Sequence, residues 1–251
     1  MDRSAYASLS AQEGSHWWFV ARRAIVDALI RTRIAPRANA RILEAGCGTG
    51  GNLAMLARHG TVDALEYDGE SLALAMSRGV GTVAVGALPD QIGFGDNCYD
   101  LIVLLDVLEH VEQDRASLAA LRERLAVGGS LLLTVPAAPW LWSDHDILHH
   151  HKRRYTLGSL SAVARSAGLE VKEVGYFNSL LFPVAVLARF AQRLTGRTTA
   201  ADSRPVRPIN ALFRHIFCME RHLIGRISLP VGLSAYAILS SGTLTLASGV
   251  S

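Results

Sequence analysis

Four glycines stand within six positions in the segment LEAGCGTGG (residues 43–51), directly after a short apolar run. Glycine lets the backbone approach a ligand closely and adopt a positive φ without a steric penalty. A helix that follows such a turn presents free N–H groups and the positive end of its dipole. The segment therefore predicts a ligand-binding turn between a strand and a helix, suited to a dinucleotide pyrophosphate or to an amino-acid carboxylate.

Three acidic residues stand where they would meet such a ligand. Glu66 ends the second apolar run, twenty residues after Gly46, and a carboxylate there can accept both hydroxyls of a ribose. Glu44 precedes the glycines, where it would attract an ammonium group and repel a pyrophosphate. Asp106 follows the fourth apolar run. Nicotinamide and S-adenosylmethionine sites share the ribose carboxylate, but Glu44 favours the cationic ligand.

Histidines gather after the fourth and fifth apolar runs. His110 closes the segment LDVLEH, and His145 and His149 lie in SDHDILHHHKRRY (residues 143–155). Histidine is the usual general base for a hydroxyl nucleophile, so these three residues are the candidate catalytic groups. Three interpretations of the second segment stay open: a base with an orienting carboxylate, a metal site, and a polar lid loop. We predict no metal.

The elements that must position these residues follow from the apolar periodicity. Short apolar runs are typical of strands buried on both faces, and they occupy residues 41–45, 61–66, 81–85, 100–105 and 130–135. Helical spacing between them covers residues 52–59, 69–78 and 111–126, the last helix being ended by VGG. Strand and helix alternation predicts a parallel sheet with helices on both faces, and ligands beyond the carboxyl ends of its strands.

The remaining elements lie at the two ends of this core. Helical patterns and strand patterns predict helices over residues 8–34 and 157–169 and strands over residues 170–177 and 234–242. The segment 177–230 carries eight arginines and two acidic residues, a charge of +6, which leaves −3 for the rest of the chain. It could cap the pocket, form a dimer interface or lie on an anionic membrane surface.

Composition limits the class of protein. A chain of 251 residues that is 50% hydrophobic and 19% charged suits one globular domain with an insertion. The net charge of +3 gives no argument for nucleic-acid binding. Three widely spaced cysteines do not form a disulfide framework, and neither a signal peptide nor a membrane span is evident. We expect a cytoplasmic protein, membrane-associated if the basic segment binds a bilayer.

Four motifs in order, ILEAGCGTGGN, LEYD, ALPDQIGFGDNCYDLIVLLDVLEHV and LAVGGSLLLTVP, resemble the class I S-adenosylmethionine-dependent methyltransferases. The resemblance covers roughly residues 40–176. Within that class the chain is similar to the small-molecule group that includes the ubiquinone-biosynthesis O-methyltransferases.

This resemblance implies an α/β fold, a Rossmann-like doubly wound sheet of seven strands, mostly parallel with an antiparallel last strand. N-terminal helices and a helical insertion before the last strand would complete it. We expect one methyltransferase domain, 1–251, divided into an N-terminal cover, a cofactor-binding core, the insertion and a last strand with the C-terminus. These segments are 1–39, 40–176, 177–230 and 231–251.

The resemblance also implies a cofactor site. Glu66 would bind the ribose, Tyr67 would stack beside the adenine, and one of two neighbouring arginines would hold the methionine carboxylate. The full set of expected cofactor contacts is Arg22, Arg23, Glu44, Gly46, Cys47, Gly48, Glu66, Tyr67, Ala87, Leu88, Leu105 and Asp106. Ala87 stands where related enzymes commonly carry an acidic residue, which leaves adenine recognition to backbone groups.

The acceptor would lie between the early helix and the segment after the fifth strand. The expected pocket residues are Trp18, Trp140, Trp142, Arg154 and Tyr155. We predict methyl transfer from S-adenosyl-L-methionine to oxygen on a small-molecule or lipid-linked acceptor, with S-adenosyl-L-homocysteine as product. An NAD-dependent oxidoreductase and a non-catalytic cofactor-binding protein remain open alternatives.

Overall fold

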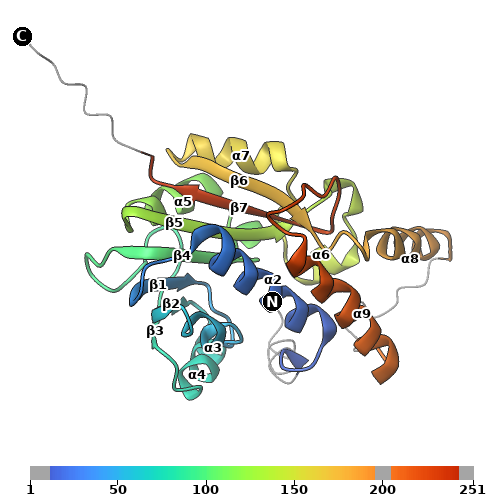
Figure 1. Cartoon of the computed structure of the whole chain (residues 1–251), viewed down its shortest axis with the longest axis horizontal. Helices are drawn as coiled ribbons and strands as arrows, with labels where there is room; N and C mark the ends of the chain where they lie inside the picture. Colours follow the sequence, from blue (N-terminus) through green and yellow to red (C-terminus); the bar gives the residue numbers. More distant parts are fainter. Residues whose placement is uncertain (1–11, 196–204, 243–251) are drawn as a thin grey trace, which may run out of the picture.

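The computed structural model describes residues 12–195 and 205–242, with side chains of the first range described to residue 191. A seven-stranded sheet lies at the centre, with helices on both of its faces (Figure 1). The strands run in the order β3-β2-β1-β4-β5-β7-β6. Their bounds are β1 (Ala40–Ala45), β2 (Gly60–Glu66), β3 (Thr82–Val85), β4 (Tyr99–Leu105), β5 (Leu125–Pro136), β6 (Glu170–Phe177) and β7 (Ser234–Ser240).

The helices connect these strands and extend the chain at both ends of the sheet. Their bounds are α2 (Trp17–Leu29), α3 (Leu53–Leu56), α4 (Gly69–Ser77), α5 (Asp114–Arg122), α6 (Asp144–Leu148), α7 (Leu157–Ser166), α8 (Phe182–Thr195) and α9 (Arg207–Met219). A π-helical turn, Ile30–Ile34, continues α2, and short 3-10 turns occupy Leu108–His110, Pro139–Leu141 and Glu220–His222. No helix of the ranges 12–195 and 205–242 is long and apolar enough to cross a membrane.

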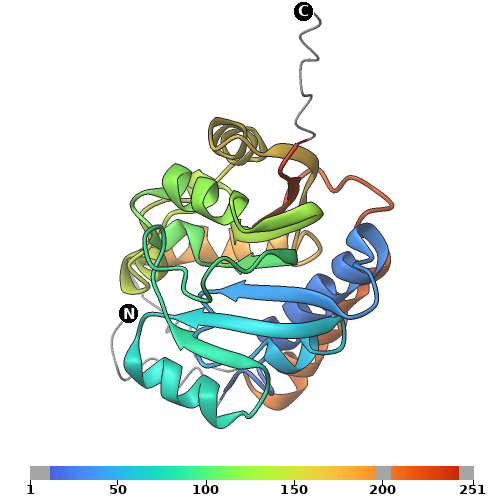
Figure 2. The ribbon, with the colours of Figure 1, turned by 90° about the vertical axis from the view of Figure 1, so that its left-hand side faces the viewer.

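The pairing of the strands confirms the predicted sheet. β1 pairs in parallel with β2 and β4, β4 pairs in parallel with β5, and β7 runs antiparallel between β5 and β6. The strand order therefore changes direction between β1 and β4. In an open α/β sheet a ligand binds at such a switch point, beyond the carboxyl ends of the strands. Figure 2 shows the arrowheads of β1 and β2 at this shared edge.

Alternate residues of the central strands enter two separate cores. Ile42 belongs to the core under α2, whereas its neighbour Leu43 belongs to the core on the opposite face, with Leu118 of α5 and Leu160 of α7. All four are fully buried. Because successive side chains of a strand point to opposite faces, burial of both faces explains why these strands read as continuous apolar runs.

The predicted helix end at VGG is wrong. α5 ends at Arg122, and the two glycines lie inside β5. The reason is a non-local contact: a Cβ on Gly129 would approach the carbonyl oxygen of Tyr99 to 2.7 Å. The register with β4 also shifts between Tyr99 and Leu101. The glycines therefore allow a close strand approach instead of ending a helix.

Two other predicted helices are shorter than expected. The helix expected over residues 52–59 comprises only Leu53–Leu56. Of the N-terminal helical prediction, residues 8–34, α2 and its π-helical continuation cover residues 17–34. Its first residues, 8–11, lie outside the described residues.

The insertion before the last strand is helical, as predicted, and α9 packs against α2 (Figure 1). The ring of Trp17 meets Phe213 and Phe217 of α9 at centroid distances of 5.6 and 5.9 Å. Asn210 donates to the carbonyl of Ser15 and accepts from the backbone N–H of Trp17. Segments nearly two hundred residues apart in sequence thus form one layer.

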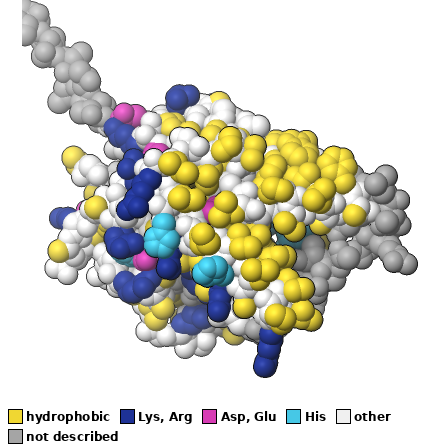
Figure 3. All heavy atoms as spheres, turned by 45° about the vertical axis from the view of Figure 1, so that its right-hand side comes forward, with side chains coloured by type: hydrophobic (Ala, Val, Ile, Leu, Met, Phe, Trp, Pro, Cys, Tyr) yellow, Lys and Arg dark blue, Asp and Glu magenta, His cyan; other side chains and the backbone are white. Residues whose placement is uncertain are grey.

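The two insertion helices also expose many large apolar side chains, which we call the apolar surface. They are Val184, Leu187, Phe190, Ile209, Leu212 and Met219, each between 44 and 70% exposed. Figure 3 shows hydrophobic side chains gathered at the end of the molecule that carries these helices.

Candidate functional site

The glycine turn after β1 has the backbone that the sequence predicts. Gly46, Gly48 and Gly50 have φ values of 78°, 54° and 80°. A Cβ on Gly46 would approach the side chain of Val107 to 2.7 Å. The turn therefore needs glycine for its φ values and, at Gly46, also for space.

Glu44 lies fully buried just before this turn. Its Oε1 accepts a hydrogen bond of 2.8 Å from the side-chain amide of Asn52, whereas Oε2 has no hydrogen-bond partner among the described residues. Burial raises the pKa of Glu44 to about 7. A buried carboxylate oxygen without a donor, beside a glycine turn, fits a cationic ammonium group.

Glu66 holds the turn together from the end of β2. Its two oxygens accept backbone N–H groups from Gly48 at 2.8 Å and from Tyr67 and Asp68 at 3.0 Å. A carboxylate has about four acceptor positions, so one position remains for a ribose hydroxyl. The neighbouring ring of Tyr67 is 67% exposed, as an adenine-stacking side chain would have to be.

Arg22, and not Arg23, reaches the carboxyl ends of the strands. Its Nε forms an ion pair with Asp106, which follows β4, and its guanidinium lies 5.2 Å from the ring centroid of Trp18. Arg23 instead donates to the backbone carbonyl of Glu13. Asp106 has a left-handed φ of 53°, a strained conformation that is often found at functional sites.

The expected adenine contacts are less open than predicted. Ala87 and Gln91 exchange two backbone hydrogen bonds of 2.9 and 2.8 Å, so the N–H of Ala87 is already used. Leu88 is half-buried against the core. Two other residues of the expected cofactor set, Leu105 and Cys47, are buried. Burial raises the pKa of the Cys47 thiol, which makes it a packing group and not a nucleophile.

Sequence reasoning missed Glu13. Its carboxylate accepts from the hydroxyl of Thr49 at 2.9 Å and pairs with Arg78, so the segment before α2 closes over the glycine turn. A Cβ on Gly51 would collide with this carboxylate. Nothing local marks Glu13, because its partners lie 36 and 65 residues away in the chain.

The histidine-rich segment is organised by Asp146, which is fully buried. Its Oδ1 accepts from Nδ1 of His151 at 2.9 Å and from Nε of Arg154 at 2.6 Å, and its Oδ2 caps α6 through the N–H of Ser143. Burial alone would raise the pKa of Asp146, but the bonds from His151 and Arg154 outweigh it and hold the pKa below the usual range.

Two predicted pocket residues have other partners. Arg154 is 6% exposed and is shared between Asp146 and the carbonyl of Ala137, so it is not open to an anionic substrate. Tyr155 is 3% exposed, packs in the core beside Leu160 and donates its hydroxyl to Asp114. Tyr155 is therefore a core residue and not a pocket wall. Asp114 lies 41 residues from Tyr155 in the chain, whereas Asp146 lies only eight residues from Arg154.

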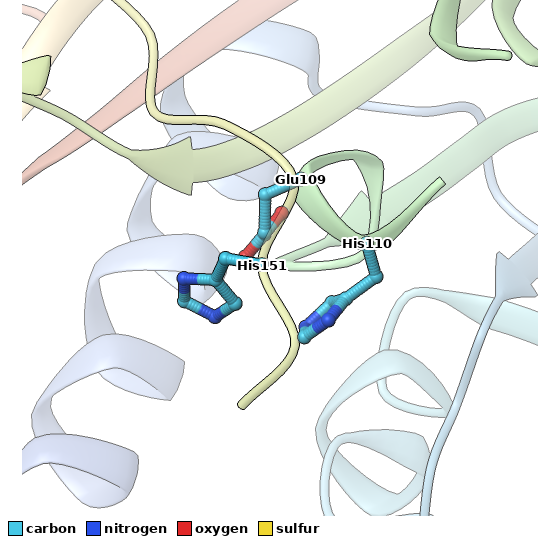
Figure 4. Close-up of side chains that lie close together, drawn as sticks. All are labelled: Glu109, His110 and His151. Atoms are coloured by element: carbon cyan, nitrogen blue, oxygen red, sulfur yellow. The ribbon is translucent and has the colours of Figure 1, made fainter. Parts of the chain in front are cut away.

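Glu109, His110 and His151 lie close together where the turn after β4 meets the loop after α6 (Figure 4). Burial raises the pKa of Glu109 well above its usual range, and the nearby charge of Asp106 adds to this. Burial, helped by His151 and His149, lowers the pKa of His110 to about 4. His110 is therefore a neutral imidazole at physiological pH.

The other predicted acceptor-side residues lie on the segment after β5. The rings of His145 and His149 are 4.3 Å apart, and Trp140, half exposed, meets Phe182 of α8 edge-to-face. Trp142 is partly buried. Their contact with an acceptor stays a prediction. Phe182 and Trp140 connect this segment to the insertion.

A sheet with this strand order, a glycine turn at its switch point and buried carboxylates around it form a Rossmann-like cofactor-binding fold. The family described as methyltransferase domain matches residues 17–174, well over half of the chain. The chain belongs to this family and is an S-adenosylmethionine-dependent methyltransferase. The match decides between the two cofactor classes that the sequence left open in favour of S-adenosylmethionine, and the buried carboxylate of Glu44 suits the positive charge of that cofactor. A search of curated proteins finds no match.

Solved structures share the fold at low sequence identity. A chain of the Haloferax volcanii complex between the Trm112 methyltransferase activator and a methyltransferase is 17% identical, with 95% of this chain and 94% of that chain covered and a TM-score of 0.62. An S-adenosylmethionine-dependent methyltransferase from Mesorhizobium loti is 16% identical, with coverages of 84 and 97% and a TM-score of 0.57.

A third structure contains the cofactor. Phosphoethanolamine N-methyltransferase 2 of Haemonchus contortus, in complex with S-adenosyl-L-methionine, is 16% identical and has a TM-score of 0.58. The match covers 86% of this chain and 52% of that chain. The narrower resemblance to ubiquinone-biosynthesis enzymes stays a prediction.

Proposed function

We propose that the protein transfers a methyl group to an oxygen atom of a lipid-linked or otherwise amphiphilic acceptor at a membrane surface. The observation that carries this proposal is the apolar surface of α8 and α9. Leu187 is 70% exposed, Leu212 is 55% exposed and Phe190 is 50% exposed. Large apolar side chains exposed in this number on both helices of the insertion indicate an interaction site.

Charge favours an anionic bilayer as the partner of this surface. Arg207 and Arg214 of α9 are exposed, as are Arg221 and Arg226 just after it. The segment 177–230 carries a charge of +6. Amphipathic helices with arginine on the polar side lie in the interface of anionic membranes, with their apolar side chains among the acyl chains.

The apolar surface adjoins the expected acceptor side of the site. Trp140 follows β5, whose carboxyl end belongs to the ligand edge of the sheet, and its ring lies 6.0 Å from that of Phe182 in α8. An acceptor with a lipid tail could rest its tail on α8 while its polar head reaches the strand ends. This arrangement supports a lipid-linked acceptor over a fully soluble one.

The residues at the strand ends suit the two ends of the cofactor. Glu44, Arg22 and Asp106 would hold the charged methionine end, and Glu66 with Tyr67 would hold the ribose and adenine. The sulfonium of the bound cofactor supplies a methyl group that is already activated. The protein has to align the acceptor oxygen with it and exclude water.

An oxygen nucleophile is favoured by the imidazoles at this edge. A hydroxyl acceptor must lose its proton during transfer, and histidine is suited to take it near neutral pH. His145, in α6, and His149, directly after it, are the candidates for this role. His110 lies with Glu109 and His151, a cluster that suggests a separate role.

A vesicle experiment tests the proposal. The full chain should sediment with phosphatidylglycerol vesicles and should transfer radiolabelled methyl from S-adenosylmethionine to hydroxyl-bearing lipids of a bacterial lipid extract. Leu187→Asp should lower vesicle binding at least tenfold, since it places a charge where the acyl chains would lie. Met76→Asp is the matched control, because Met76 is 58% exposed on α4, away from the insertion. Label found only on water-soluble acceptors, or equal sedimentation of both variants, would refute a membrane acceptor.

A further inference from the structure

Three side chains with metal-ligand chemistry come together at the carboxyl end of β4. Glu109 and His110 belong to the turn after β4, and His151 belongs to the loop after α6. One ligand atom from each residue lies within 4.8 Å of the other two. Figure 4 shows the three side chains grouped between these two segments.

Glu109 supplies an independent sign that a ligand is bound here. The residue is 1% exposed, and its Oε2 has no hydrogen-bond partner within the part of the chain that the structure describes. Burying a carboxylate oxygen without a partner is costly, so such an atom is usually compensated by a cation or a donor. No donor from the described residues fills this place.

His151 is already oriented as metal-binding histidines are. Its Nδ1 is held by the buried carboxylate of Asp146 at 2.9 Å, which leaves Nε2 for a ligand. A carboxylate behind the second ring nitrogen fixes the ring orientation and the tautomer of a metal-bound histidine. The ring of His110 meets that of His151 edge-on, with centroids 4.7 Å apart.

The local charges also leave room for a cation. Asp106 is paired with Arg22, and Asp146 is paired with Arg154. Glu109 is the third carboxylate of this region, and no ion pair joins it to a guanidinium among the described residues. A bound cation would supply the positive charge that lets this buried carboxylate ionise.

Against the expectation of no metal from the sequence, we propose that Glu109, His110 and His151 bind a divalent transition-metal ion. Two imidazoles and one carboxylate suit Zn²⁺, Mn²⁺ or Co²⁺ better than Mg²⁺ or Ca²⁺, which prefer oxygen ligands throughout. The ligand atoms now lie within 4.8 Å of one another. Small rotations of the side chains would bring them to the metal–ligand distance of ~2.1 Å. Three protein ligands leave at least one position open.

This role rests on the proposed function. The open position would take the hydroxyl oxygen of the acceptor and lower its pKa, so that its proton passes to solvent or to a nearby histidine. The oxygen–carbon bond then forms as the sulfur–carbon bond of S-adenosylmethionine breaks. The products are the methyl ether, neutral S-adenosylhomocysteine and one proton.

Metal uptake can be measured without any acceptor. The full chain, freed of any polyhistidine tag and stripped with a chelator, is titrated with Zn²⁺ by calorimetry and with Co²⁺ by visible absorption. We expect one ion per chain. Glu109→Gln and His151→Ala should each weaken binding by more than about a hundredfold, because loss of an outer-shell partner alone costs 10–100-fold.

His150→Ala is the matched control, since His150 is exposed and adjacent in sequence but outside the cluster. It should bind the metal as the unaltered chain does. All variants must keep their circular dichroism and their binding of S-adenosylhomocysteine, which separates a lost metal site from a lost fold. The proposal is overturned if the unaltered chain takes up no ion, or if His150→Ala weakens binding as much as His151→Ala.

Failure of this inference is distinguishable from failure of the proposed function. Methyl transfer to lipid that persists in chelator, in a chain that binds no Zn²⁺ or Co²⁺, removes the metal site and leaves the function. Stoichiometric uptake of metal that depends on Glu109 and His151, in a chain that methylates only soluble acceptors, supports the metal site and removes the lipid acceptor.

Discussion

Glu44 lies where folding and cofactor binding make opposite demands on one carboxylate. It is fully buried, and its pKa is raised from 4.5 to about 7. Well below pH 4.5 it is protonated in both the folded and the unfolded chain. Between pH 4.5 and 7 the unfolded chain ionises this group while the folded chain still holds its proton, so stability falls over that range and the loss is complete above pH 7.

Glu44→Gln should therefore raise the free energy of unfolding at pH 8 by up to about 3 kcal/mol and change it little at pH 4.5. The amide keeps an acceptor for Asn52 but carries no charge. Urea denaturation at both pH values measures this difference. The same variant should bind S-adenosylmethionine more weakly, because the ammonium group loses its counterion. An equal gain in stability at both pH values would contradict the assignment of the raised pKa.

Glu66 connects the backbone of the turn to the predicted ribose site. Glu66→Ala removes the acceptor of three backbone N–H groups as well as the bond expected with the ribose. Each charge-assisted bond contributes about 1.5–3 kcal/mol, so affinity for S-adenosylhomocysteine should fall at least tenfold. Calorimetry on the folded variant measures it, with Glu123→Ala, exposed at the end of α5, as the control. Unchanged affinity would remove Glu66 from the site.

At the scale of the elements, the segment after β5 carries the two candidate general bases of the reaction, His145 and His149. If His145 or His149 accepts the acceptor's proton, His145→Ala and His149→Ala should leave S-adenosylhomocysteine binding near normal. At least one of them should lower turnover by more than about a hundredfold, the usual effect of losing a general base. Single-turnover kinetics with saturating cofactor measures this. Normal turnover in both variants would end the hypothesis.

The elements that sequence reasoning predicted best are those whose signal is local. Ile42 and Leu43 are both buried because helices cover both faces of β1, so an uninterrupted apolar run was enough to predict the strand. The glycine turn was equally readable, since its φ values and close contacts require glycine itself. The cofactor edge of the sheet followed from these two signals.

The elements that sequence reasoning missed depend on partners distant in the chain. Glu13 reaches Thr49, Tyr155 reaches Asp114, and Gly129 lies against Tyr99. In each case the residue type fits several roles, and only the fold selects one. The acidic residues of the segment 143–155 fit an orienting carboxylate or a metal ligand, and only the fold shows that Asp146 caps α6 and pairs with Arg154.

At the scale of the whole molecule, the two ends of the chain form one layer that supports the site. α9 packs on α2, and Phe217 of α9 is fully buried between Trp17 and Phe177, stacking on the latter at a centroid distance of 6.2 Å. Phe177 is itself fully buried in this core. Since α2 also carries Arg22, the position of the Arg22–Asp106 pair depends on a helix of the insertion.

Phe217→Ala should therefore weaken both the fold and the cofactor site. Removing a buried phenylalanine costs about 3–5 kcal/mol, so thermal unfolding should shift to markedly lower temperature. Because α2 loses its packing partner, affinity for S-adenosylhomocysteine should also fall severalfold at temperatures where the variant is folded. Leu212→Ala on the same helix is the control, since Leu212 is 55% exposed and should change neither quantity. A destabilised variant with unaltered affinity would show that α2 holds Arg22 in place without help from α9.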